Sequence, residues 1–142
     1  MKRVHIITDS TSDISQHEAA KLGIDVVPMH VNIDGVDYID GLTINNQDFF
    51  KKLRTAKILP KTSAPSPGSF LDIINKYPKD EEILIMTISS DASATYSSAK
   101  LAVEESERDN IVLYDTRQAT IGLLALVHAA VSFRDVGDNA RI

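Results

Sequence analysis

The chain has 142 residues and a formal net charge of −5, with 43% hydrophobic and 25% charged residues. This composition is typical of one globular domain with a real core. The acidic balance leaves no basic footprint for nucleic-acid binding. The absence of cysteine excludes disulfides, thiolate zinc sites and cysteine nucleophiles.

The amino-terminal apolar run at 4–8 is too short for the core of a signal peptide. No run approaches the roughly 20 apolar residues that span a membrane. We therefore expect a cytoplasmic protein without an integral membrane segment.

Three nearly unbroken apolar runs predict strands that are buried on both faces, as in a parallel sheet covered by helices. They are "VHIIT" (4–8), "ILIMTI" (83–88) and "IVLY" (111–114). "IDVVPMHV" (24–31) carries a fourth strand, which Pro28 interrupts or places at an edge.

Within "VNIDGVDYI" (31–39), Asp34-Gly35 separates two alternating arms and predicts a hairpin with a type I′ turn. Val31 should then lie opposite Tyr38. We interpret this hairpin as an insertion in a β-α-β pattern.

Helical segments separate the predicted strands. They cover 14–23, 46–56, 68–77, 93–107 and 119–133. Ser15 is the expected cap of the first helix and Gly23 its stop. Helices that alternate with strands predict an α/β fold of three α/β/α layers around a mainly parallel sheet.

Polar loops follow three of the predicted strands, at 9–13, 89–99 and 115–120, and should line one rim of the sheet. A fourth polar segment is "KTSAPSPG" (61–68), which we interpret as a stiff loop of hydroxyl groups leading into a helix at Pro67.

Hydroxyl groups that precede helices can bind an anion together with backbone N–H groups and the helix dipole. Ser89, Ser90, Ser93 and Thr95 precede or open the predicted helix at 93–107. Thr62, Ser63 and Ser66 precede the predicted helix at 68–77. The alternative is that these residues are only helix caps and turn formers, which composition alone favours.

An enzymatic alternative rests on Asp9, which ends the first predicted strand as the nucleophile of a phosphohydrolase or phosphotransferase does. The following "STSD" lacks the second aspartate expected two residues later, and no Gly-rich phosphate loop occurs. The histidines share no metal-type spacing, and His128 is expected in the core or at its edge. For Asp9 and Asp13, a role as helix caps or loop-ordering groups is favoured over a role as metal ligands.

Five motifs together resemble the DegV family of fatty-acid-binding proteins, in order and in spacing. They are "ITDSTSD", "VVPMHVNIDGVDYIDG", "TSAPSPGSF", "ISSDASATYSSAKLA" and "VLYDTRQATIGL", and they span nearly the whole chain. The resemblance implies that Thr62, Ser63 and Ser93 bind the carboxylate of a long-chain fatty acid, whose acyl chain enters an apolar tunnel. It also implies a binding subunit that presents the acid to a separate fatty-acid kinase, with no cofactor and no metal.

We predict that the ligand-binding residues are Thr62, Ser63, Ser66, Ser90, Ser93 and Thr95, with Asp9 and Ser10 from the first loop. The chain departs from the family pattern S-S-x-L-S-G-T-Y, because Ala92 and Ala94 replace its Leu and Gly.

The family continues for about as long again beyond Ile142, so we interpret residues 1–142 as its amino-terminal domain, without the carboxyl-terminal domain. A lone first domain would expose the surface that meets the second, and self-association as an interaction module is a third alternative.

Overall fold

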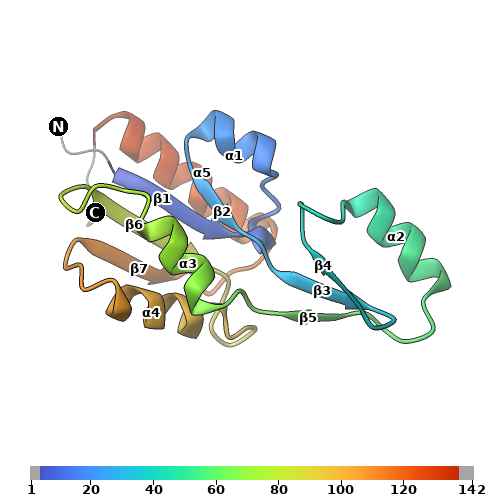
Figure 1. The fold of residues 1–142 in the computed structure, drawn as a ribbon. Coiled ribbons are helices and arrows are strands. Elements are labelled where there is room, and N and C mark those ends of the chain that lie inside the picture. The colour runs from blue at the N-terminus through green and yellow to red at the C-terminus, as the bar shows by residue number, and fades with distance from the viewer. Residues whose placement is uncertain (1–3, 138–142) are drawn as a thin grey trace.

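The computed structural model describes residues 4–137. Four parallel strands form the main sheet, in the order β2-β1-β6-β7. Their bounds are Val4–Asp9 (β1), Asp25–Val27 (β2), Glu82–Thr87 (β6) and Ile111–Asp115 (β7). The prediction of a parallel sheet is confirmed, and so is its place between two layers of helices (Figure 1).

Alternate residues of the strands divide between two cores. Ile6 of β1 packs toward the helices α1 (Gln16–Leu22) and α5 (Ile121–Asp135). Ile7, the next residue, packs toward α3 (Pro67–Ile74) and α4 (Thr95–Glu105). Burial on both faces explains why these strands read as unbroken apolar runs.

Local signals begin and end the helices as expected. The Ser15 hydroxyl accepts from the Glu18 amide, the Glu18 side chain returns to the backbone of Ser15, and this capping box starts α1. Gly23 ends α1 at φ 62°, in the left-handed conformation that glycine adopts without a steric penalty. Ser66 caps α3, which begins at Pro67.

A second, antiparallel sheet forms a small lobe beside the main body (Figure 1). Its strands are β3 (His30–Ile33), β4 (Val36–Ile39) and β5 (Lys61–Ser63), and the helix α2 (Asn46–Thr55) belongs to the same lobe. The predicted hairpin is confirmed, since Val31 pairs with Tyr38. Its turn residues Asp34 and Gly35 have φ of 49° and 85°, as a type I′ turn requires.

The predicted interruption at Pro28 is confirmed, since 24–31 divides into β2 and β3, which belong to different sheets, because proline cannot donate a ladder hydrogen bond. Two expectations are corrected. Thr62 and Ser63 lie in a strand rather than a loop, since β5 pairs with β3. His128 is exposed on the outer face of α5, so its expected place in the core or at its edge is wrong.

Candidate functional site

The loops at the carboxyl end of the main sheet meet one another, as predicted. Asp9 ends β1, and its carboxylate accepts from the backbone amides of Thr11 at 2.9 Å and Ile88 at 2.8 Å. The Ser89 amide donates to the Gln118 carbonyl, also at 2.9 Å. The Asp9, Ser89 and Gln118 loops are therefore joined by direct hydrogen bonds.

Asp9 itself is fully buried, with 0% of its surface exposed. Burial raises the pKa of its carboxyl group, because charge is costly away from water, and hydrogen bonds from Thr11 and Ile88 only partly oppose this effect. Both carboxylate oxygens accept from the protein. Asp9 is consequently placed as a loop-ordering group, and its burial does not suit a nucleophile that must meet a substrate.

The amino terminus of α4 brings two predicted hydroxyls together. The Oγ of Ser93 lies 2.9 Å from the Oγ1 of Thr95 and accepts from the Thr95 amide at 3.3 Å. Ala94 occupies the cap position and gives α4 no side-chain cap. The first turn of a helix has N–H groups without intrahelical partners, and here they lie beside these hydroxyls at the positive end of the dipole. This arrangement suits an anion.

Met29 connects the predicted residues of three segments. Its amide donates to the Ser10 Oγ at 3.0 Å, and its sulfur lies 3.5 Å from the Thr95 Oγ1. Ser63 of β5 pairs with His30, the residue after Met29. The side chains of Thr62 and Ser63 are exposed. No motif in the sequence singles out Met29, whose contacts depend on the fold.

Ser66 and Ser90 have partners within the protein. Ser66 caps α3 by accepting from the Ser69 amide at 3.2 Å. Ser90 donates its amide and hydroxyl to Asp115. The Ser90 hydroxyl holds the pKa of Asp115 below its ordinary value, assisted by Arg117. The cap alternative thus describes the geometry of Ser66, and contact of either serine with a ligand stays a prediction.

Arg117 joins two loops of the rim and does not belong to the predicted site. Its guanidinium contacts the carboxylates of Asp91 and Asp115. Its backbone adopts φ 55°, which is uncommon for a residue with a side chain. The sequence marks "DTRQAT" only as a polar loop, because the pairing of Arg117 with Asp91 is a long-range contact.

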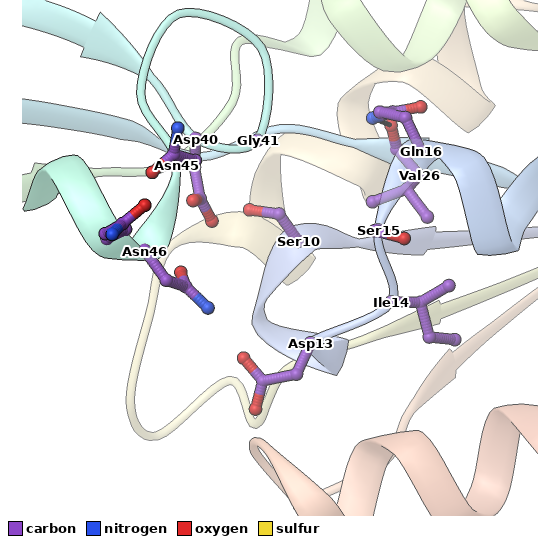
Figure 2. Close-up of a pocket in the computed structure, with 11 residues that line it drawn as sticks. Ser10, Asp13, Ile14, Ser15, Gln16, Val26, Asp40, Gly41, Asn45 and Asn46 are labelled. Atoms are coloured by element: carbon purple, nitrogen blue, oxygen red, sulfur yellow. Dashed lines mark hydrogen bonds between the residues drawn. The ribbon is translucent and has the colours of Figure 1, made fainter.

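A pocket of about 470 Å³ lies between the main body and the small lobe (Figure 2). Its walls carry Ser10, Asp13, Ile14, Ser15, Gln16, Val26, Asp40, Gly41, Asn45, Asn46 and Gln47. Figure 2 shows Asp40 and Ser10 on facing sides. The carboxylates of Asp13 and Asp40 make this pocket unfavourable for a third carboxylate. Most of its lining residues carry polar or charged side chains, and Ile14 and Val26 are its apolar members.

Residues 4–137 offer neither a metal centre nor a membrane span. No group of three or more His, Asp or Glu side chains in this range is arranged to hold a metal ion. No helix in the same range is long and apolar enough to cross a membrane.

The family model described as uncharacterised proteins of the DegV family matches residues 3–141. A DegV domain-containing protein of Clostridium acetobutylicum is 36% identical over 140 residues, which are 98% of this chain and 50% of that protein. The chain therefore spans about half the length of the curated relatives it matches.

Solved structures show the same likeness. A DegV family protein of Thermus thermophilus, described for its fatty acid binding, aligns with a TM-score of 0.86 at 34% identity, over 96% of this chain and 49% of that one. The fatty acid kinase B3 protein of Streptococcus pneumoniae, loaded with linoleic acid, shares the fold with a TM-score of 0.80 at 20% identity, over 97% and 50% of the two chains. The motifs, the fold and the family match agree, and the chain belongs to the DegV family.

Proposed function

We propose that this chain takes part in binding a long-chain fatty acid by its carboxylate. The observation that carries the proposal is its likeness to the Thermus thermophilus protein, at 34% identity and a TM-score of 0.86. That protein is described by its fatty acid binding. Identity at this level across nearly the whole chain supports a shared ligand class, whereas a shared fold alone would not.

The head group is proposed to lie between the start of α4 and a second place, formed by the end of β5 and the segment that joins β5 to α3. Ser93 supplies a half-buried hydroxyl at the first of these places, and the Oγ1 of Thr95, a residue that is 0% exposed, lies 2.9 Å from it. Thr62 and Ser63 supply exposed hydroxyls at the second. Hydrogen bonds to a carboxylate are charge-assisted and stronger than neutral ones. Pro65 and Pro67 restrict the second segment, so less entropy is lost when it closes on the head group.

The proposed function extends to the acyl chain of the ligand and to a partner protein. The acyl chain would enter an apolar tunnel to which the other half of longer relatives contributes. A separate kinase would phosphorylate the presented acid, so this chain would bind without catalysing, and it would act in the cytoplasm. The kinase B3 protein of Streptococcus pneumoniae supports this partnership by its description, although at 20% identity it shares only the fold.

The test begins with native mass spectrometry of the purified protein, followed by solvent extraction of any bound lipid. A fatty acid near one per chain would support the proposal. Oleate affinity is then measured for Ser93→Ala and Thr62→Ala, each expected to lose about 1–2 kcal/mol, as loss of a hydrogen bond to a charged group does.

Ser97→Ala is the matched control, because Ser97 is exposed on α4 beyond the proposed contacts. Unchanged oleate affinity in both site variants would contradict the carboxylate role. A wild-type protein that stays empty at high oleate would show that these residues alone do not bind the acid.

A further inference from the structure

Asp9 is a buried carboxylate for which the structure provides no counter-ion. The residue is 0% exposed, and no ion pair to it is found within residues 4–137. Burying an unpaired charge lowers the stability of a protein. A group that a fold retains at such a cost is a candidate for a role in the neighbouring site.

The contacts of Asp9 indicate what this role is. One oxygen accepts from the Thr11 amide at 2.9 Å and from the Thr11 hydroxyl at 2.5 Å, and the other accepts from the Ile88 amide at 2.8 Å. A carboxylate that accepts from two backbone N–H groups and a hydroxyl is held as a bound anion would be held. Here the anion is covalently part of the chain.

The Ile88 contact leads directly to the proposed head-group site. The next residue, Ser89, starts the turn that precedes α4, and its carbonyl accepts from the Ala92 amide at 3.0 Å and from the Ser93 amide at 3.2 Å. Asp9 therefore fixes the backbone at the point from which the Ser93 loop departs. Each of its oxygens already accepts a hydrogen bond from the protein and the residue is 0% exposed, so it presents no accessible group to a ligand.

We propose that Asp9 is a positioning residue that acts as a built-in anion. Its carboxylate occupies the N–H groups of Thr11 and Ile88 and so holds the Ser93 loop in the shape that binds a carboxylate. This role rests on the proposed function, and it differs from the expectation that Asp9 contacts the ligand. Removing the carboxylate should leave an unoccupied anion site of the size of one carboxylate, which a small free acid could fill.

The experiment is chemical rescue. Oleate affinity and the amide resonances of Ile88 and Ser93 are measured for Asp9→Ala, with sodium formate added and sodium chloride at equal ionic strength as the control. We expect Asp9→Ala to bind oleate at least tenfold more weakly and to shift both resonances. Formate, but not chloride, should recover at least threefold of the affinity and return the resonances toward their wild-type positions.

Two variants separate positioning from loss of stability. Ile74→Val weakens the core far from the rim, and it should leave oleate affinity and the Ser93 resonance unchanged. Asp9→Asn should shift the Ile88 resonance without responding to formate, because the amide group still fills the site. If Asp9→Ala does not fold, the Ile88 resonance of Asp9→Asn still tests whether Asp9 positions the loop.

Wild-type affinity in Asp9→Ala, or equal effects of formate and chloride, would overturn the positioning role. If wild-type protein does not bind oleate, the proposed function fails, while the response of the two resonances to formate still decides whether Asp9 organises the loop.

Discussion

The main body and the small lobe both consist of strands and helices, but their apolar side chains differ in how completely they are buried. In the body, Phe70, Ile74 and Ile85 are all 0% exposed. In the lobe, no residue of α2 is buried, and Phe50 is 57% exposed. Since stability follows the apolar area removed from water, the body carries the fold, and the lobe is held largely by its hairpin and a few contacts. Low local stability is typical of segments that respond to a ligand or partner.

The largest expected effect compares one phenylalanine from each region. Phe70→Ala should cost about 3–5 kcal/mol of unfolding free energy, because it leaves a cavity in the core between the sheet, α3 and α4. Phe50→Ala should change it by less than about 0.5 kcal/mol, as expected for an exposed site. Urea denaturation followed by circular dichroism measures both. Equal losses would show that the lobe shares the stability of the body.

A smaller effect is expected from Arg108, an arginine of the main body. The Arg108 guanidinium donates to the carbonyls of Ile74, Tyr77, Pro78 and Glu81, and so fastens the amino end of the sheet. Arg108→Ala should cost about 2–3 kcal/mol, because it leaves several carbonyls without this donor.

Arg54→Ala is the control for this arginine, since Arg54 is exposed at the end of α2 and should contribute almost nothing. Thermal unfolding of the two variants checks the difference. A loss below about 1 kcal/mol for Arg108→Ala would mean that water replaces the guanidinium at these carbonyls.

The hairpin turn tests whether the lobe opens independently of the body. Gly35→Ala should cost about 1 kcal/mol, because φ is 85° there and a Cβ meets no atom within 4 Å, so only the backbone conformation is unfavourable. Hydrogen exchange should accelerate in β3 and β4 and remain unchanged in β1 and β6. Gly68→Ala lies in α3 at an ordinary φ and should be neutral or slightly stabilising. Faster exchange throughout the chain would contradict a separate lobe.

The smallest effect is a pH dependence at the rim where body and lobe meet. Burial raises the pKa of Asp9 in the folded protein above its ordinary value of 3.8. The folded state therefore holds this proton more tightly than the unfolded state, and the resulting stability is present at low pH and lost as pH rises through the folded-state pKa.

Relative to Asp9→Asn, the wild type should lose stability as pH rises above 3.8, with a slope below about 1.4 kcal/mol per pH unit for one proton. Chemical denaturation of both proteins between acidic and neutral pH gives this difference. A constant difference across that range would mean that Asp9 ionises as readily in the folded protein as in the unfolded chain.

Much of the candidate site was accessible from the sequence because its residues follow strands. In a parallel sheet, loops after neighbouring strands meet at one edge, so the positions of Asp9 and Ser90 along the chain were enough to place them at the rim. Met29 and Arg117 could not be found this way. Met29 joins Ser10 to Thr95 only because β2 and β3 diverge after Pro28, and Arg117 pairs with Asp91 across 26 positions of sequence.

The sequence alone determined the elements that have a local cause. Apolar runs marked the buried strands, Ser15 and Gly23 bounded a helix, and Asp34-Gly35 marked the hairpin, since each signal acts within a few residues. Only the tertiary structure decided that β5 is a strand, because three residues gain their hydrogen bonds from β3. It also decided that Asp9 is buried with its oxygens occupied, since the Ile88 amide reaches it from 79 residues away in the chain.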